Sequence, residues 1–291
     1  MAKTGATSAT DRAVSPDAAR GGGVLAELLA KARPLVMGVL NVTPDSFSDG
    51  GLFMQPTAAI EHARRLAAEG ADIIDIGAES TRPYGGARPV PLAEERARLE
   101  PILPAVATIG VPVSVDTIKA SVAAWALEAG AVMVNDVWGL QRDPDMARVV
   151  AEHGAPVVIM HNRDTVDLAV NIVADVTEFF SRSLEIAWAA GIAHDRIVLD
   201  PGIGFGKTPE QSLACIARLH AWRSFDLPLL VGASRKRFIG SISPSEPMQR
   251  FGGSLAAHLL AVEHGAAIIR THDVASTVQA LAVAAAIRRA R

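Results

Sequence analysis

Short runs of branched apolar residues alternate with longer amphipathic stretches from Pro34 to the end of the chain. Near-continuous apolar runs are typical of strands that are buried on both faces, as in a parallel sheet. The stretches between them, such as Ala58–Glu69 and Leu92–Ala107, carry apolar residues three and four positions apart, which predicts helices. The alternation therefore predicts right-handed βαβ units. The predicted strands are Leu35–Leu40, Asp72–Ile76, Val113–Val115, Val132–Val134, Pro156–Met160, Arg196–Leu199, Leu229–Val231 and Ala267–Arg270.

A short motif with a central glycine recurs where a predicted helix gives way to a strand. Its copies are Glu69-Gly70-Ala71, Ala129-Gly130-Ala131, His153-Gly154-Ala155 and His264-Gly265-Ala266. Glycine just after a helix adopts a left-handed conformation without the steric penalty of a Cβ atom. Eight strand–helix units favour an α/β fold of the closed (β/α)₈ TIM barrel type, with an open doubly wound sheet as the alternative.

The first 23 residues have a different composition, being small and polar without an apolar core segment. Such a segment cannot bury enough apolar surface to offset the entropy of ordering it. We therefore expect residues 1–33 to be a disordered tail with a possible short helix at Val24–Arg33, and residues 34–291 to form the barrel. A targeting peptide is the less favoured alternative for this tail.

Composition and charge narrow the class of protein. The 291 residues carry 28 basic and 31 acidic side chains, a net charge of −3, and no long basic run, which argues against nucleic-acid binding. No apolar run approaches the roughly 20 residues that a membrane-spanning helix needs. The single cysteine, Cys215, cannot form an internal disulfide, so a reducing compartment, the cytoplasm, is expected.

Polar side chains follow every predicted strand, where barrel enzymes gather their reactive groups. They are Asn41, Asp75, Glu79, Asp116, Asn135, Asp136, His161, Asn162, Asp200, Ser234, Arg235, Lys236, Arg270 and His272. Each one alone is more often a turn residue than a ligand. Together they predict one pocket that holds carboxylates, amides and cations.

Three of the connections after strands are unusual. Asn41–Gly51 and Gly77–Gly86 are longer than the usual two to six residues and are rich in glycine, proline and serine, which is typical of lids and binding loops. Asp200–Lys207 resembles a phosphate cradle but lacks the GxxxxGK[ST] spacing.

Seven segments in order along the chain resemble the dihydropteroate synthase family. They are MGVLNVTPDSFSDGG (37–51), GAESTRP (77–83), VSVDT (113–117), VNDVWG (134–139), DPGIGFGK (200–207), GASRKRFIG (232–240) and RTHDV (270–274). The resemblance implies an enzyme of folate synthesis that joins 4-aminobenzoate to the methylene of 6-hydroxymethyl-7,8-dihydropterin diphosphate. The products are 7,8-dihydropteroate and diphosphate, Mg²⁺ assists, and sulfonamides compete with 4-aminobenzoate.

The same resemblance assigns roles to individual residues. It implies that the pterin is bound by Asp116, Asn135, Asp200 and Lys236. It implies that the diphosphate is bound by Arg270, His272 and Asn41, with Asn41 also the Mg²⁺ ligand. It implies that the aminobenzoate site is closed by Phe47, Ser48, Asp49, Thr81, Arg82, Pro83 and Phe205. Asp116, Asp200, Lys236, Arg270 and His272 would be the catalytic residues, and Cys215 would only pack in a helix.

Two other functions fit parts of the pattern. A pterin-binding methyltransferase domain shares the Asp and Asn contacts to pterin, but its substrate has no diphosphate for Arg270 and His272 to bind. A non-catalytic paralogue that keeps the barrel is the second alternative. The family is usually a homodimer through outer helices near the C-terminus, and apolar residues within Leu255–Val262 and Val278–Ile287 permit this.

Overall fold

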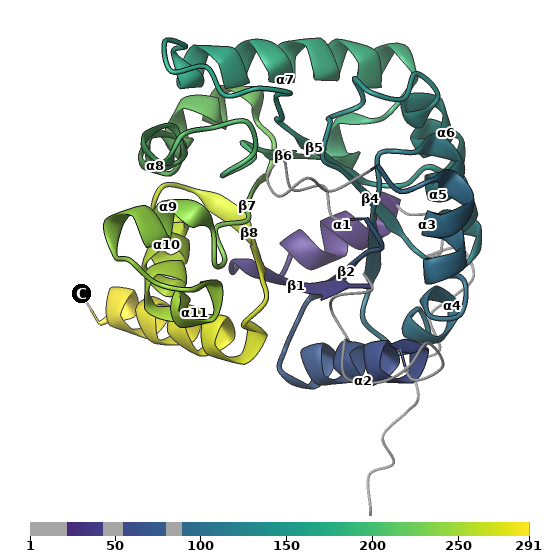
Figure 1. The fold of residues 1–291 in the computed structure, drawn as a ribbon, viewed down its shortest axis with the longest axis horizontal. Coiled ribbons are helices and arrows are strands. Elements are labelled where there is room, and N and C mark those ends of the chain that lie inside the picture. The colour runs from purple at the N-terminus through teal and green to yellow at the C-terminus, as the bar shows by residue number, and fades with distance from the viewer. Residues whose placement is uncertain (1–21, 43–54, 80–88, 291) are drawn as a thin grey trace, which may run out of the picture.

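Eight parallel strands close into a barrel in the computed structural model, which describes residues 22–42, 55–79 and 89–290 (Figure 1). Each strand pairs with the next one along the chain, and β8 pairs with β1. The (β/α)₈ prediction is therefore confirmed, and the open doubly wound sheet is wrong. The strands are β1 Leu35–Asn41, β2 Ile73–Gly77, β3 Val113–Asp116, β4 Met133–Asp136, β5 Val157–Met160, β6 Ile197–Asp200, β7 Leu229–Val231 and β8 Ala266–Thr271.

The helices that follow the strands form an outer ring (Figure 1). They are α2 Gln55–Ala68, α3 Leu92–Leu99, α4 Leu103–Val106, α5 Ala120–Glu128, α6 Met146–His153, α7 Ile172–Ala189, α8 Pro209–Ala217, α9 Arg237–Ile242, α10 Phe251–Glu263 and α11 Val274–Arg289. The single helix expected over Leu92–Ala107 is wrong, because it is divided into α3 and α4 around Pro101, whose ring lacks an N–H donor and disfavours a helical residue before it. None of the helices within the described ranges is long and apolar enough to cross a bilayer.

The predicted glycine stops are confirmed at all four junctions. Gly70, Gly130, Gly154 and Gly265 have φ angles of 97°, 111°, 59° and 108°. After the first three, the N–H of the next alanine donates to a carbonyl five residues earlier, which is the bond that satisfies a helix end in this motif. The left-handed glycine thus ends each helix and turns the chain into the next strand of the sheet.

Side chains alternate between the barrel interior and the surrounding helices, as the period of two in a strand requires. Val134 and Ile159 belong to the large cluster shared with the helices, whereas Met133 and Val158 belong to a separate cluster inside the barrel. The interior cluster lies near the start of the strands. Its strand members are Leu35, Met37, Ile73, Met133, Val158, Val198, Leu230 and Ile268.

Helix α1, Gly22–Leu29, closes the barrel at the end where the strands begin. Its Leu25 and Leu28 are 0% and 4% exposed and join the interior cluster. Figure 1 shows α1 lying across the centre of the strand ring. The short helix expected at Val24–Arg33 therefore exists with shifted bounds, and it packs as the floor of the barrel.

The segment after α1 is tied to the same end of the barrel by Asp72, which precedes β2. Lys31 Nζ lies 2.6 Å from Asp72 Oδ1, and Arg33 donates to both carboxylate oxygens at 2.8 Å. The N–H of Val36 donates to Asp72 Oδ2 at 3.0 Å. These bonds hold the segment that leads into β1 against the residue that precedes β2.

We expect Leu25→Ala to lower the free energy of unfolding by about 2–4 kcal/mol, because truncation leaves a cavity in a closed interior. Urea denaturation measures this change. Glu27→Ala, on the exposed face of the same helix, is the control and should change stability by less than about 0.5 kcal/mol. Equal losses in the two variants would show that α1 does not pack against the barrel.

Candidate active site

The interior of the barrel changes from apolar to polar toward the carboxyl ends of the strands. Side chains that point inward there come from β2, β3, β4, β6 and β8, and we call them the upper layer. The upper layer consists of Asp75, Asp116, Asn135, Asp200 and Arg270. All but Arg270 are buried, with Asp75 fully inaccessible. The apolar floor and the polar upper layer therefore share one interior.

Arg270 reaches from β8 past β1 to the carboxylates of β2 and β3. Its Nε donates to Asp75 Oδ2 at 2.6 Å, and its Nη2 donates to Asp116 Oδ2 at 2.8 Å. Asn135 on β4 donates from Nδ2 to the same Asp75 oxygen at 3.0 Å. Burial opposes the charge on Arg270, but the two carboxylates outweigh it and raise the pKa of the guanidinium. The cation thus joins β8 to β2 and β3, and Asp75 joins β4 to the same cluster.

Two acceptors in this cluster are buried without any hydrogen-bond partner among the described residues. They are Asp75 Oδ1 and Asp116 Oδ1. A buried acceptor without a donor costs about 1–3 kcal/mol, so such atoms occur where a ligand or water supplies the donor. Burial also raises the pKa of Asp116, and the charge of Arg270 opposes this rise only in part. The upper layer therefore presents acceptors that await donors.

Asp200 ends β6 and occupies the opposite side of the same interior. The N–H of Gly202 donates to its Oδ1 at 2.7 Å, while Oδ2 has no hydrogen-bond partner within the described residues. Burial raises the pKa of Asp200 to about 6 despite that bond and the nearby cation of Lys236. Lys236 follows β7, and its Nζ lies 4.0 Å from the centre of the Phe205 ring, which is within the range of a cation–π contact.

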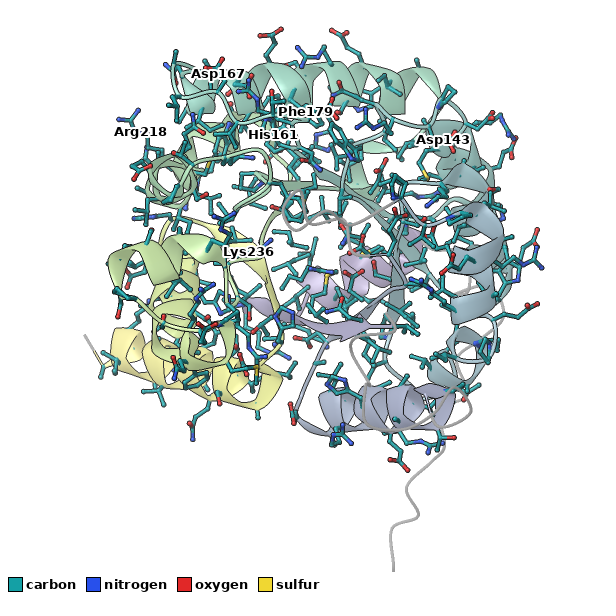
Figure 2. All side chains as sticks on the ribbon, in the orientation of Figure 1. Asp143, His161, Asp167, Phe179, Arg218 and Lys236 are labelled. Atoms are coloured by element: carbon teal, nitrogen blue, oxygen red, sulfur yellow. The ribbon has the colours of Figure 1, made fainter. Side chains whose placement is uncertain are left out.

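Phe205 is a loop residue whose ring is buried. It lies in the loop between β6 and α8, as its flanking glycines predict, yet it is only 8% exposed and packs with Val137 and Met160. Figure 2 places Lys236 at the inner rim of the ring, whereas Arg218 lies on the outer surface. The Phe205 ring thus forms an apolar wall beside a cation that faces the centre.

The last strand end supplies a second cationic region. Ser234 lies between the backbone N–H and the ring of His272, with Oγ 3.3 Å from the N–H nitrogen and 3.0 Å from Nδ1. Arg270 keeps one guanidinium nitrogen, Nη1, without a hydrogen bond in the described part of the chain. Asn41 ends β1, the strand next to β8, and is partly exposed. Cationic and amide groups therefore lie on neighbouring strand ends.

Some strand-end residues do not enter the pocket, and this part of the sequence prediction is wrong. Asp136 follows Asn135 directly, so it faces the opposite side of the sheet, where it accepts from the N–H groups of Trp138 and Leu140. His161 turns toward helix α7, where its Nε2 lies 3.0 Å from Asp175 Oδ2. Asp136 is a turn residue, and His161 belongs to a separate cluster.

The phosphate-cradle resemblance of Asp200–Lys207 is also wrong for its lysine. The Lys207 side chain is 3% exposed and donates to the carbonyls of Gly202 and Phe205 within its own loop, at 2.9 and 3.1 Å. Its charge is therefore directed into the protein. Cys215 is buried in α8 as a free thiol, as expected.

Six residues implied by the family resemblance lie outside the described residues. They are Phe47, Ser48, Asp49, Thr81, Arg82 and Pro83. The sequence pattern marks Asp75 only as a strand-end residue, but the structure shows that it accepts hydrogen bonds from both Arg270 and Asn135. Its position two residues before the end of β2, on the same face as Ile73, is the signal that places it inside the barrel.

A resident metal ion held by the protein alone has no support in the described ranges. No group of three or more His, Cys, Asp or Glu side chains there could hold one. Asn41 offers a single amide oxygen, a hard ligand of the kind that Mg²⁺ accepts when it keeps several waters and binds substrate phosphates. The donor set therefore fits a Mg²⁺ that arrives with a phosphorylated ligand.

The sequence profile of the family described as "Pterin binding enzyme" matches residues 37–272, which run from within β1 to the residue after β8. The chain is 46% identical over 248 residues to the dihydropteroate synthase of Bacillus subtilis (strain 168), covering 84% of this chain and 85% of that protein. The chain belongs to the dihydropteroate synthase family.

Solved structures of this family superpose on the fold described above. Xanthomonas albilineans dihydropteroate synthase with 4-aminobenzoic acid has a TM-score of 0.84 at 46% identity, covering 88% of this chain and 93% of that one. The same enzyme in complex with 7,8-dihydropteroate has a TM-score of 0.81 at 44% identity, covering 88% and 94%. The resemblance found in the motifs is therefore confirmed over most of the chain, and the family is one of transferases in folate biosynthesis.

For this member of the dihydropteroate synthase family, we expect the buried Asp200 to destabilise the ligand-free protein as pH rises. The folded-state pKa of about 6 lies above the ordinary value of 3.8, so the folded state binds the proton more tightly than the unfolded chain. The stabilisation that this group contributes is present below about pH 4 and is lost as pH rises through 6. The slope is at most about 1.4 kcal/mol per pH unit.

Asp200→Asn should remove this contribution and flatten the dependence of unfolding free energy on pH between 4 and 6, measured by urea denaturation. Asp195→Asn, which changes an exposed carboxyl, is the control and should leave the slope unchanged. An unchanged slope in Asp200→Asn would contradict a raised pKa at this position.

Proposed function

We propose that this chain catalyses the condensation of 6-hydroxymethyl-7,8-dihydropterin diphosphate with 4-aminobenzoate. The observation that carries the proposal is the buried acceptor Asp116 Oδ1, which has no hydrogen-bond partner in the described part of the chain and faces the same interior as Asp200. A pterin ring presents a row of N–H donors and ring acceptors along one edge, and it needs fixed carboxylates and amides to bind it. The X. albilineans structures hold 4-aminobenzoic acid and 7,8-dihydropteroate, a substrate and the product of the proposed reaction, and they support the same activity here.

In this proposal, Asp116, Asn135 and Asp200 bind the pterin. The guanidine-like edge of the ring donates a pair of hydrogen bonds, which suits a carboxylate such as Asp200. Asp116 Oδ1 receives a further donor, which relieves its missing hydrogen bond. Lys236 contacts the ring from its place beside Phe205. The ring then fills the upper layer, above the apolar floor.

Arg270, His272 and Asn41 bind the diphosphate in the proposed complex. Nε and Nη2 of Arg270 bond Asp75 and Asp116, and in this proposal Nη1 donates to the diphosphate. The bridging C–O bond breaks, the diphosphate leaves with the electron pair, and cations at this end stabilise the leaving charge. When Mg²⁺ is bound with the diphosphate, it supplies further neutralisation of that charge. Asn41 is its proposed protein ligand.

The aniline nitrogen of 4-aminobenzoate attacks the methylene carbon, which carries positive character after the diphosphate departs. A new C–N bond forms and the nitrogen loses one proton, giving 7,8-dihydropteroate. An aniline is already nucleophilic at neutral pH, so the proposal needs no activating base. Phe205 forms one wall of the proposed aminobenzoate site, and the other residues that the family resemblance assigns to it, 47–49 and 81–83, lie outside the described ranges. Asp116, Asp200, Lys236, Arg270 and His272 are the proposed catalytic residues.

Diphosphate release from the pterin diphosphate, with and without 4-aminobenzoate, tests the activity. We expect release to require 4-aminobenzoate and to match the amount of 7,8-dihydropteroate formed. Pterin binding without any release would favour a non-catalytic paralogue. Failure to bind the pterin diphosphate would contradict the proposed site itself.

Two substitutions should separate the pterin and diphosphate ends of the site. Asp200→Asn should abolish pterin binding in calorimetry, because an amide cannot accept the same pair of hydrogen bonds. Arg270→Ala should weaken binding of the pterin diphosphate by about 2–4 kcal/mol more than binding of the unphosphorylated pterin. Equal losses for both ligands would remove Arg270 from the anion site.

A homodimer in the cytoplasm completes the proposal. Leu260 on α10 and Val283 and Ile287 on α11 are 49%, 54% and 60% exposed. These helices pack against each other, so the exposed residues offer an apolar surface for a second copy. Sedimentation velocity tests this: a dimer that Ile287→Glu dissociates is expected, and a monomer at all concentrations would contradict it.

A further inference from the structure

Lys207 is a buried cation that the proposed reaction does not use. It lies at the end of the loop between β6 and α8, with its side chain directed away from the barrel interior and toward helix α7. Its Nζ lies 2.6 Å from His161 Nδ1, 2.9 Å from the Gly202 carbonyl oxygen and 3.1 Å from the Phe205 carbonyl oxygen. Two of these partners belong to the loop that carries the pterin-binding and aminobenzoate-binding groups.

We infer that Lys207, held by His161 and Asp175, is a positioning residue that fixes the 201–206 loop and thereby aims Asp200 and Phe205 at the substrates. The inference rests on the proposed function, since it is this function that gives Asp200 and Phe205 their ligands. Lys207 bonds the loop through the carbonyls of Gly202 and Phe205, and its charge also acts on Asp200, so both routes connect this cation to the substrate-binding groups.

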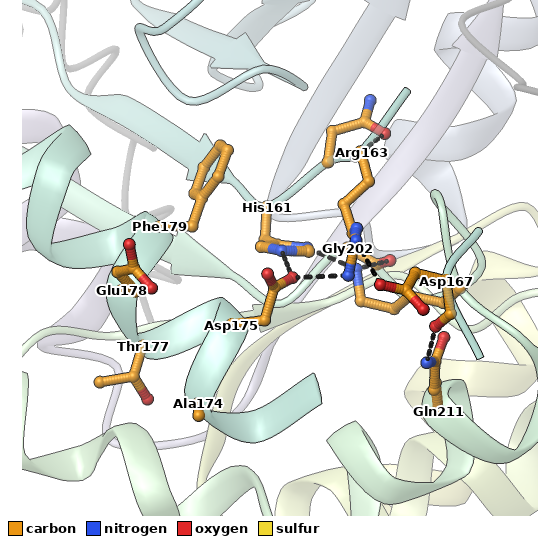
Figure 3. Close-up of polar contacts among 12 residues, drawn as sticks. His161, Arg163, Asp167, Ala174, Asp175, Thr177, Glu178, Phe179, Gly202 and Gln211 are labelled. Carbon is orange, nitrogen blue, oxygen red and sulfur yellow. Dashed lines mark hydrogen bonds and ion pairs between the residues drawn. The ribbon is translucent and has the colours of Figure 1, made fainter. Parts of the chain in front are cut away.

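The hydrogen atoms of the cluster are consistent with one arrangement. A protonated Lys207 can only donate, so Nδ1 of His161 must accept. Nε2 of the neutral ring then carries the proton and donates to Asp175 Oδ2, 3.0 Å away. Arg163 also donates to that oxygen, at 3.2 Å. Figure 3 shows the His161 ring beside the Asp175 carboxylate, with Arg163 approaching the same group. The imidazole thus connects the buried ammonium to a carboxylate on α7.

The charges around this cluster favour the same protonation states. Burial and the neighbouring Lys207 lower the pKa of His161 to about 4, so the ring is neutral at physiological pH. The hydrogen bond from His161 lowers the pKa of Asp175, which keeps its charge. Burial lowers the pKa of Lys207 to about 8, partly opposed by Cys215, Asp200 and Asp175. The arrangement is therefore a cation, a neutral ring and an anion in a row.

We call Lys207, His161 and Asp175 together the Lys207 clamp. The 201–206 loop needs this clamp because three of its residues have positive φ angles. Gly202, Gly204 and Gly206 have φ angles of 65°, 80° and 55°, a conformation that glycine adopts readily but does not enforce. The loop is also pressed against its neighbours. A Cβ on Gly202 would lie 1.9 Å from the His161 carbonyl oxygen, and one on Gly206 would lie 2.4 Å from Arg163 Cβ. Glycine permits this path, and Lys207 selects it by bonding two of the loop carbonyls.

The selected path has direct consequences at the site. The N–H of Gly202 donates to Asp200 Oδ1, and the carbonyl of the same residue accepts from Lys207. One peptide region is therefore held on one side by the clamp and on the other by the pterin-binding carboxylate. The second clamped carbonyl belongs to Phe205, whose ring lies under Lys236. Loss of the ammonium would release both groups together.

Calorimetry with two ligands on the full-length protein tests the inference. The probes are 6-hydroxymethylpterin and inorganic diphosphate with Mg²⁺. We expect Lys207→Met to raise the Kd of the pterin by about tenfold or more, since one charged hydrogen-bond unit is lost, and to change the Kd of diphosphate by less than about twofold. Ser212→Ala is the matched control. It removes a buried hydrogen bond from Ser212 Oγ to the Thr208 carbonyl at the start of α8, outside the clamp, and should change neither Kd.

A second pair of variants protects the test against misfolding of Lys207→Met. His161→Phe keeps the ring that packs edge-on against Phe179 but removes both polar contacts. It should weaken pterin binding, whereas His161→Gln, whose amide can accept from Lys207 and donate to Asp175, should restore most of the affinity. In ¹⁵N NMR, His161 should show an unprotonated Nδ1 and a protonated Nε2 that Lys207→Met alters.

The outcomes separate the inference from the proposed function. Unchanged pterin affinity in Lys207→Met would overturn the positioning role, and so would equal losses for pterin and diphosphate, which indicate a general loss of structure. Asp200→Asn is measured in the same series. If it too leaves pterin affinity unchanged, the assignment of the pterin site fails; if it abolishes binding while Lys207→Met has no effect, only the positioning role fails.

Discussion

The rest of the site depends on one guanidinium placed between two buried carboxylates. Arg270 neutralises Asp75 and Asp116 inside a closed barrel, where an unpaired charge would be costly. Its reach from β8 to β2 and β3 leaves one oxygen on each carboxylate without a donor among the residues that the structure describes. The cluster therefore holds strands together and keeps acceptors ready for a ligand. Removing Arg270 would leave two buried carboxylates without their cation, so this part of the site depends on it.

The two ends of the barrel divide stability from chemistry. At the floor, Leu25 and Leu28 of α1 pack with the first inward-facing residues of the strands, and Asp72 fastens the entry of β1. At the other end, the same strands carry carboxylates, an amide and a cation. Burial raises the pKa values of Asp116 and Asp200 there, and burying these polar groups lowers the stability of the fold. This division follows the usual placement of barrel active sites at the carboxyl ends of the strands.

The strands and the glycine stops were predictable from the sequence because both arise from local rules. Continuous apolar runs mark strands buried on both faces, and glycine marks a left-handed helix end. Family motifs then named Asp116, Asn135, Asp200, Lys236 and Arg270 before any geometry was known. The direction of each strand-end side chain was not predictable without the strand register. Asp136 and His161 looked equivalent to Asn135 and Asp200 in sequence, yet a shift of one residue turns them to the helix side. Asp75 was undervalued for the same reason, and the Lys207 clamp depends on a contact across 46 residues.

Titration of Asp116 with and without bound pterin tests the central claim most directly. Carboxyl ¹³C NMR of aspartate-labelled protein follows this group, with Asp116→Asn used to assign its signal. The account predicts that burial holds the pKa of free Asp116 above its ordinary value and that 6-hydroxymethylpterin lowers it, because a donor then reaches the unpartnered Oδ1 and stabilises the carboxylate. A pKa that is unchanged or raised by the pterin would contradict the claim that the upper layer of the barrel binds the pterin ring.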